Sequence, residues 1–196
     1  MCARKLFAKK GFDGVSVKDV SEAAGLNISL ISYHFKGKES LYRACLESFG
    51  QESLEAVTRI LEPAKSFEEC ELRIGMFIDL MLDIFVTQPD AALMVFRESD
   101  VDALMFQDLF KSAFLAIFKN VIKFFEEVQK FGLISKTIDP HTLSSILMGS
   151  LSHFSLVDSI SSKYFERSLS DPKHKLRVSQ HLKKIFANGL EAKINL

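Results

Sequence analysis

The chain has 196 residues, of which 47% are hydrophobic, and its 25 Lys and Arg residues balance its 25 Asp and Glu residues. This length leaves room for a small domain beside a larger one with a substantial core. No apolar run approaches the roughly 18 residues that a membrane helix needs, and no secretory signal pattern follows Met1. Cys2, Cys45 and Cys70 match no metal or redox spacing, so we expect a reduced, cytoplasmic protein without a membrane segment.

The neutral overall charge conceals an uneven distribution. Residues 1–46 contain eight Lys and Arg residues and four Asp and Glu residues. Residues 47–196 contain 17 Lys and Arg residues and 21 Asp and Glu residues. A basic N-terminal segment on an acidic remainder favours approach to phosphates. Solvated helix faces that bind nothing could carry the same lysines, so the charge alone leaves both interpretations open.

A first helix is expected at residues 2–10. Leu6 and Phe7 would anchor this helix in a core. Gly11 would end it, because glycine adopts the left-handed backbone conformation that closes many helices.

Residues 16–43 predict two short helices, joined by a tight turn and followed by a third helix. Ser16 and Asp19 have the spacing of an N-cap and its reciprocal partner, and Gly25 suits the end of the helix that they begin. Asn27 is a favourable N-cap for the next helix. This arrangement is a helix-turn-helix, which makes double-stranded DNA the expected partner.

The second of these short helices has two different faces. Ile28, Ile31 and Phe35 recur at a helical spacing that buries one face. The opposite face combines small polar side chains with an aromatic one, which suits entry into the major groove. Its residues are Ser29, Leu30, Ser32 and Tyr33.

Four short motifs stand out between residues 6 and 41. They are Leu6-Phe7-Ala8-Lys9-Lys10-Gly11-Phe12, Ala24-Gly25, Tyr33-His34-Phe35 and Lys38-Glu39-Ser40-Leu41. In these motifs and their spacing, the chain resembles the DNA-binding domain of the TetR family of bacterial repressors. The resemblance implies an all-α fold, with a helix-turn-helix DNA-binding domain at residues 1–46 and a helical effector-binding and dimerisation domain at residues 47–196. Family members usually begin the first helix a turn or two earlier than this chain does.

The resemblance implies DNA contacts at individual positions. Residues that match positions touching base edges are Lys18, Ile28, Ser29, Leu30, Ser32 and Tyr33, and residues that match positions holding phosphates are His34 and Lys38. Ser32 replaces an aromatic residue that is frequent in the family, so no base preference is carried over. Ile28 could instead be a core residue, and His34 could be a structural hydrogen-bonding group.

Beyond this domain we expect only helices. A long helix is predicted from Lys38 to about Leu61, ahead of Pro63, and the resemblance implies that it connects the DNA-binding domain to the rest. Apolar periodicity and Pro residues at helix starts predict further helices at 67–87, 90–98, 103–131, 140–162 and 172–191. The helix at 103–131 is apolar nearly all round, which predicts a central position.

The last two expected helices carry apolar and small residues at spacings of three and four, which suit a helix bundle. The resemblance implies a homodimer built from this pair, as the reading of a two-fold operator requires. The expected interface residues are Leu143, Leu147, Leu151, Val157, Val178, Leu182, Ile185 and Phe186. Burial within a single chain would produce the same pattern.

The 18 Phe and six Met residues raise the question of an effector pocket. The resemblance implies a cavity among the helices expected at 67–87, 103–131 and 140–162, which would favour an apolar or aromatic effector. The expected lining residues are Phe77, Met81, Phe85, Phe114, Phe118, Met148, His153 and Phe154, with Arg97 as a further polar anchor. These residues could equally be ordinary core, and His153 an ordinary structural residue.

The sequence contains no nucleophile elbow, phosphate-binding loop or metal-ligand cluster, so we expect neither an enzyme nor a cofactor or metal site. The resulting hypothesis is a DNA-binding transcriptional regulator, a repressor that binds a palindromic operator as a homodimer and is released by a small effector. Two alternatives stay open: a helix-turn-helix regulator without an effector, and a helical adaptor without DNA affinity.

Overall fold

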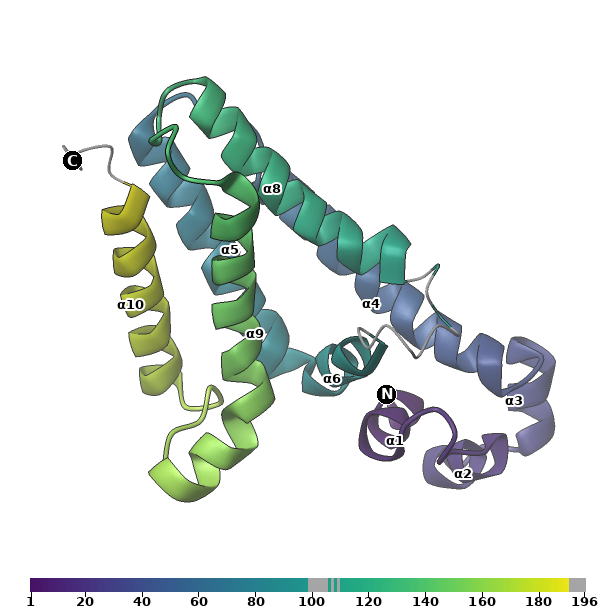
Figure 1. Cartoon of the computed structure of the whole chain (residues 1–196). Helices are drawn as coiled ribbons and strands as arrows, with labels where there is room; N and C mark the ends of the chain where they lie inside the picture. The colour runs from purple at the N-terminus through teal and green to yellow at the C-terminus, as the bar shows by residue number, and fades with distance from the viewer. Residues whose placement is uncertain (99–105, 107, 109, 191–196) are drawn as a thin grey trace. The chain divides into compact units, whose positions relative to one another are not determined.

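The computed structural model describes residues 1–98, 106, 108 and 110–190, and every element within them is a helix (Figure 1). These elements are α1 (Cys2–Lys10), α2 (Val17–Ala24), α3 (Ile28–Phe35), α4 (Lys38–Ile60), α5 (Phe67–Thr87), α6 (Pro89–Glu98), the π-helical turn η2 (Phe110–Phe114), α8 (Leu115–Lys130), α9 (Pro140–Phe165) and α10 (Pro172–Leu190). The all-α prediction is therefore confirmed. Part of the expected helix at 103–131, namely residues 103–105, 107 and 109, lies outside the described residues, as does residue 191.

The chain forms two compact units. The N-terminal unit comprises residues 1–54 and 88–116, and the C-terminal unit comprises residues 55–87 and 117–196. Residues 88–116 belong with the N-terminal helices because α6 packs against α1. The compact units therefore do not follow the expected division after residue 46.

An aromatic cluster holds the N-terminal unit together. The side chains of Phe7 and Tyr42 are almost completely buried, and their rings meet edge to face with centroids 4.8 Å apart. Phe12 meets Tyr42 at 5.2 Å, and Met94 of α6 is buried in the same cluster. Burying an apolar side chain of this size contributes roughly 1.5–3 kcal/mol, so the cluster fixes α1, α4 and α6 together as a support for the helix-turn-helix.

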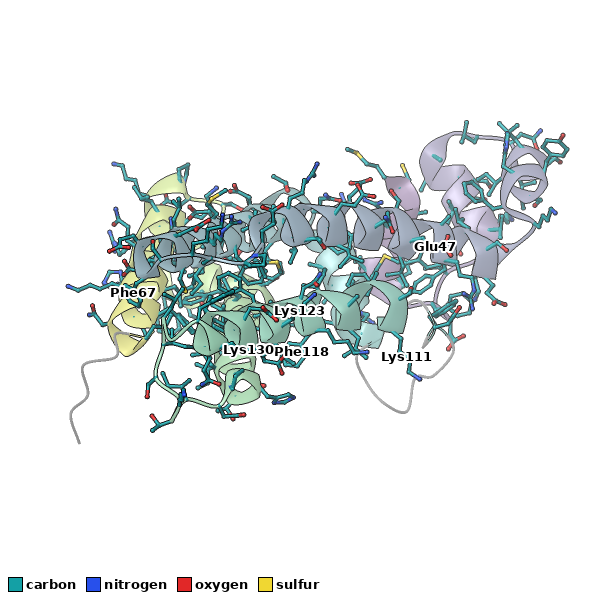
Figure 2. The ribbon with its side chains drawn as sticks, turned by 90° about the horizontal axis from the view of Figure 1, so that it is seen from above. Glu47, Phe67, Lys111, Phe118, Lys123 and Lys130 are labelled. Atoms are coloured by element: carbon teal, nitrogen blue, oxygen red, sulfur yellow. The ribbon has the colours of Figure 1, made fainter. Side chains whose placement is uncertain are left out.

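Helix α5 holds the central position in the C-terminal unit. Nine of its residues are buried, and it packs against both α9 and α10. Helix α8 instead buries one side, with Phe124 and Phe125 inward, and exposes charged residues such as Lys123 and Lys130 on the other (Figure 2). The prediction of an apolar surface nearly all round was therefore wrong for the described part of this helix, because its Lys and Glu residues gather on one face.

The later helices begin where the sequence predicted. The Asp139 carboxylate accepts a hydrogen bond from the Thr142 N–H at 2.7 Å, and Pro140 occupies the first turn of α9. The Asp139 carboxylate accepts hydrogen bonds from the Thr142 hydroxyl and from the Thr142 N–H, and these bonds lower the pKa of the Asp139 carboxyl. None of the helices in the described ranges is long and apolar enough to cross a membrane.

Candidate nucleic-acid interface

The helix-turn-helix is fixed by short-range hydrogen bonds. The Ser16 hydroxyl accepts from the Asp19 N–H at 3.1 Å, and the Asp19 carboxylate accepts from the Ser16 N–H at 2.7 Å, which completes a capping box. The Ser16 hydroxyl also donates to the Asp19 carboxylate at 2.5 Å. This bond, followed by the bond from the Ser16 N–H, lowers the pKa of the Asp19 carboxyl. Gly25 ends α2 in the left-handed conformation, with φ 63°, and the Asn27 side chain caps α3 by accepting from the Ser29 N–H at 2.8 Å. The predicted local geometry is confirmed at each of these positions.

The outer face of α3 is exposed. Tyr33 is 80% exposed and Leu30 is 46% exposed, and Ser29 and Ser32 lie on the same solvent-facing side. Ile31 faces the other way and is only 6% exposed, so it anchors the helix in the aromatic cluster's core. A rigidly anchored helix thus presents four side chains that have no packing role in the described structure.

Ile28 and His34 were each ambiguous in the sequence. The Ile28 side chain is 44% exposed, so it is not the core residue that its spacing allowed. His34 is also exposed, and its ring lies edge to face with Tyr33 at 5.4 Å. Both side chains are therefore accessible to a partner that approaches α3.

Two lysines flank α3 in different ways. The Lys18 side chain is 75% exposed and lies 3.8 Å from Glu22, a weak surface ion pair. The Lys38 ammonium donates to the Phe12 carbonyl oxygen at 3.1 Å and lies 4.2 Å from the Phe12 ring centroid. An ammonium group has three donors, so Lys38 keeps capacity for a further acceptor while it ties the start of α4 to the turn after α1.

The connection from α3 to α4 needs an unusual backbone. Lys36 has φ 55°, and Gly37 has φ 132°, a value at which a side chain would be strained. The first turn of α4 follows at once, and its leading N–H groups have no partner within the helix. Free N–H groups beside Lys38 make this helix start suitable for an anion such as a phosphate.

The predicted effector-pocket residues do not gather around one described cavity. Phe77, Met81 and Phe85 are core residues of the C-terminal unit, at most 8% exposed. Phe114 lies in the N-terminal unit beside Phe49, with ring centroids 6.0 Å apart. Two further groups complete the set: Phe118, Met148 and Phe154 are half-buried, and His153 is exposed. Arg97 is exposed as well, and its guanidinium lies next to Gly11.

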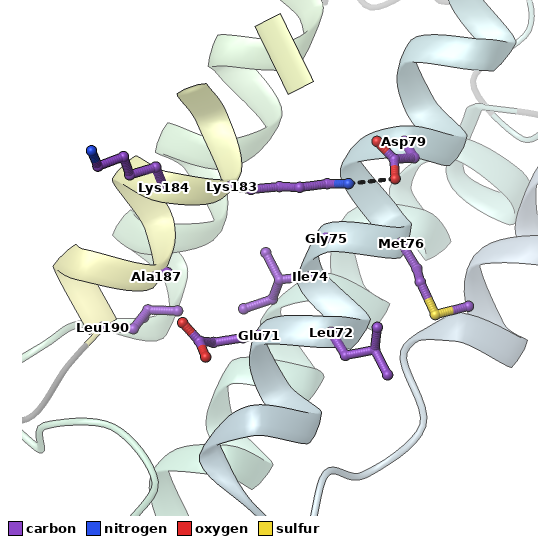
Figure 3. Close-up of a pocket in the computed structure, with 10 residues that line it drawn as sticks. All are labelled: Glu71, Leu72, Ile74, Gly75, Met76, Asp79, Lys183, Lys184, Ala187 and Leu190. Atoms are coloured by element: carbon purple, nitrogen blue, oxygen red, sulfur yellow. Dashed lines mark hydrogen bonds and ion pairs between the residues drawn. The ribbon is translucent and has the colours of Figure 1, made fainter. Parts of the chain in front are cut away.

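Two cavities of the C-terminal unit have the size of small-molecule sites. One, of about 520 Å³, lies beside the second half of α9 and includes His153 and Phe154 of the predicted set. The other, of about 420 Å³, lies between α5 and α10. Figure 3 shows the Lys183 ammonium reaching across this second cavity to the Asp79 carboxylate, which also accepts from the Ser179 hydroxyl at 2.6 Å.

The sequence did not predict the α5–α10 cavity, because nothing in either segment alone reports that the two helices pair. Gly75 gives no signal either. A Cβ at this position would lie 3.4 Å from the Lys183 side chain, which is an ordinary van der Waals distance, so the lysine stem could lie on α5 with alanine there as well.

The predicted dimer residues are mostly turned inward. The structure buries Leu147, Leu151, Val178, Leu182 and Phe186 within the C-terminal unit, half-buries Leu143 and Val157, and leaves Ile185 63% exposed. The prediction was wrong for the five buried residues, because α9 and α10 use that face to pack inside their own chain. Besides Ile185, the same helices expose apolar side chains that the prediction did not include, namely Ile146, Leu156, Ile160, Tyr164, Phe165 and Leu176.

Comparison with known proteins adds a sequence match in the N-terminal region. The sequence profile described as "Bacterial regulatory proteins, tetR family" matches residues 2–45. The probable HTH-type transcriptional regulator YttP of Bacillus subtilis (strain 168) is 28% identical over 132 residues, which cover 64% of this chain and 62% of YttP. The chain thus matches somewhat less than two thirds of the length of that relative.

Two solved structures show that the fold continues beyond the matched region. The MbdR regulator from Azoarcus sp. CIB covers 96% of this chain and 95% of its own, with a TM-score of 0.78 and 18% identity. The regulator FadR from Bacillus subtilis was solved in complex with stearoyl-CoA. Its match covers 97% of this chain and 96% of the FadR chain, with a TM-score of 0.71 and 15% identity. Residues 2–45 therefore match the sequence profile of the bacterial tetR family of regulatory proteins, and the chain as a whole shares the fold of these two solved regulators.

Proposed function

We propose that the protein is a ligand-responsive repressor that binds a palindromic operator as a homodimer and inserts α3 into the major groove. The observation that carries this proposal is the outer face of α3, where Leu30 and Tyr33 are exposed on a helix anchored by the buried Ile31. Large side chains with no packing role gain free energy only when a partner covers them. The width of the major groove admits one helix of this kind.

The residues around α3 divide into two roles. Ile28, Ser29, Leu30, Ser32 and Tyr33 read base edges through hydrogen bonds and apolar contacts. Lys18 also contacts a base edge, while His34 and Lys38 contact phosphates on either side. The bond between Lys38 and the Phe12 carbonyl supports the phosphate role, because it holds the ammonium in one place before DNA arrives.

The homodimer is proposed to form through the exposed apolar side chains of α9 and α10. Ile146, Leu156 and Ile160 recur along α9 at helical spacing, and Ile185 adds an exposed apolar side chain on α10. A two-fold interface uses the same surface of both copies, so one stripe is sufficient. Two recognition helices related in this way read half-sites that lie about 34–36 Å apart.

The response to an effector is proposed to run along α4. This helix continues without interruption from Lys38 to Ile60, so it belongs to both compact units. An effector that binds one arrangement more tightly shifts the population toward it and changes operator affinity. FadR of Bacillus subtilis, which shares this fold, was solved with stearoyl-CoA, which supports an effector with an apolar part.

A second candidate is a regulator that binds DNA without a small-molecule effector. The burial of Phe77, Met81 and Phe85 favours it, because side chains that are at most 8% exposed behave as solid core. An adaptor that has lost DNA affinity is the third candidate. It would bind no operator, whatever the ionic strength.

The decisive experiment is selection of genomic DNA fragments from the source organism by the purified full-length protein. We expect fragments that share a two-fold sequence, bound with an affinity that falls steeply as the salt concentration rises. Ser32→Ala should change which fragments are selected. Ser170→Ala, at an exposed serine of the C-terminal unit, is the matched control and should select the same set as the parent protein. Recovery of unrelated fragments would contradict the proposal.

A further inference from the structure

We propose that the cavity beside the second half of α9 binds a small carboxylate with an apolar body. This inference rests on the proposed effector response and names a site and a ligand class for it. The cavity, of about 520 Å³, is lined by α9, by the turn at residues 166–171 and by the first turn of α10. All of these segments lie within the C-terminal unit.

The apolar part of the site comes from aromatic side chains. Phe154 is half-buried and Phe165 is 68% exposed, and both line the cavity. Leu169, at 4% exposure, closes the side formed by the turn. A cyclic or aliphatic body in the cavity would remove exposed apolar area of the lining side chains from water, which is favourable in proportion to that area.

The polar part of the site contains a nitrogen atom that lacks a partner. His174 Nδ1 is buried and has no hydrogen-bond partner among the described residues. Buried polar side-chain atoms are nearly always hydrogen-bonded, and His174 is one of the residues that line the cavity, so its unpaired nitrogen indicates a group that a ligand would supply. A protonated Nδ1 would donate to a carboxylate oxygen.

The charges around the cavity specify the ligand further. Arg167 is an exposed residue that lines the cavity, and a guanidinium is the group that pairs best with a planar carboxylate. His153, also exposed, lines the cavity from α9. Asp158 also lines it, but its two oxygens accept from the Leu169 N–H at 2.6 Å and from the Ser168 hydroxyl at 2.9 Å. The Asp158 carboxylate therefore holds the turn, and its negative charge favours a monoanion over a dianion such as phosphate.

Titration calorimetry on the full chain tests the proposal with phenylacetate and octanoate as aromatic and aliphatic probes. We expect at least one acid to bind once per chain, and we expect phenylacetamide, the neutral counterpart, and inorganic phosphate to bind far more weakly. Arg167→Gln should weaken acid binding about tenfold or more, because it removes a charge-assisted pair. Arg177→Gln, at an exposed arginine of α10 outside the cavity, should leave the affinity within about twofold.

Several results would overturn the inference. They are the absence of binding by either acid, equal binding of the amide, and an Arg167→Gln variant that binds as the parent does. A changed dimer dissociation constant for Arg167→Gln, without a change in acid binding, would assign the cavity to a partner subunit instead. Operator binding is measured on the same preparations: intact DNA binding without acid binding refutes this site alone, whereas acid binding without DNA binding refutes the proposed repressor function.

Discussion

Truncation of Tyr33 to alanine should separate DNA recognition from folding. The Tyr33 side chain is 80% exposed, and its one ring contact in the described structure is the edge contact with His34 at 5.4 Å. Surface substitutions of this kind usually change the free energy of unfolding by less than about 0.5 kcal/mol. The midpoint of thermal unfolding should therefore move by less than about 2 °C.

The effect on DNA binding should be much larger. A side chain that contacts base edges contributes about 1–3 kcal/mol to discrimination, and each 1.4 kcal/mol corresponds to about tenfold in affinity. A dimer carries the change twice, so Tyr33→Ala should weaken operator binding by at least about tenfold and alter the selected sequence. Fluorescence anisotropy with a selected operator measures the affinity, and circular dichroism measures the unfolding.

The matched control is Phe131→Ala, which removes an aromatic side chain that is 63% exposed in the C-terminal unit. It should change neither operator affinity nor sequence selection. The interpretation of α3 would be refuted if Tyr33→Ala bound the operator as tightly as the control. A loss of more than about 2 kcal/mol of stability would also refute it, because it would reveal a packing role for Tyr33.

Three further substitutions test other parts of the structure. Lys38→Ala should weaken binding to all DNA sequences alike. It should also reduce the slope of log affinity against log salt concentration by roughly 0.9 for each phosphate that the protein no longer neutralises, as measured by fluorescence anisotropy across a salt series. A change in sequence preference would contradict the phosphate role. Ile160→Asp, at a 53% exposed position, should dissociate the dimer in sedimentation experiments while the fold is retained, and a dimer that persisted would exclude this face. Gly50→Ala should lower the free energy of unfolding, measured in urea, by about 1–3 kcal/mol, because the new methyl group would lie 2.6 Å from the Ala113 Cβ. Gly189→Ala is the control and should cause no such loss, because open space surrounds that position. Equal effects of the two substitutions would contradict the packing argument.

The helix-turn-helix was predictable because each of its determinants is local. Ser16 and Asp19 are three residues apart, Gly25 ends its helix through its own backbone freedom, and Asn27 caps the next helix two residues on. Such bonds form within a few residues whatever the rest of the chain does. The outward face of α3 then follows from a helical spacing whose inner side is fixed by Ile31.

The composition of the compact units was less predictable, since it depends on contacts between distant residues. The Arg4 guanidinium donates to the Gln88 side chain at 3.0 Å, across 84 positions, and Met94 enters the core that Phe7 begins. Neither residue has a local pattern that indicates its partner. The cavity beside α9 has the same origin, because His174 and Phe154 meet only when the turn between α9 and α10 is in place.

The error at the dimer residues has a more general physical cause. Along α9, Leu147 and Leu151 are apolar, and so are Ile146 and Leu156 on a different side of the helix. Apolar periodicity indicates that one face of a helix is covered, but it does not identify the element or subunit that covers it. In a helix with two apolar faces, periodicity therefore cannot tell which face packs inside the chain. The side that meets α5 is decided by which set of side chains fills the space around that helix, a property of the folded chain. A second apolar face on a helix of a monomer would stay exposed to water, which is unfavourable. The exposure of Ile146, Leu156 and Ile160 therefore supports the proposal that a second subunit covers them.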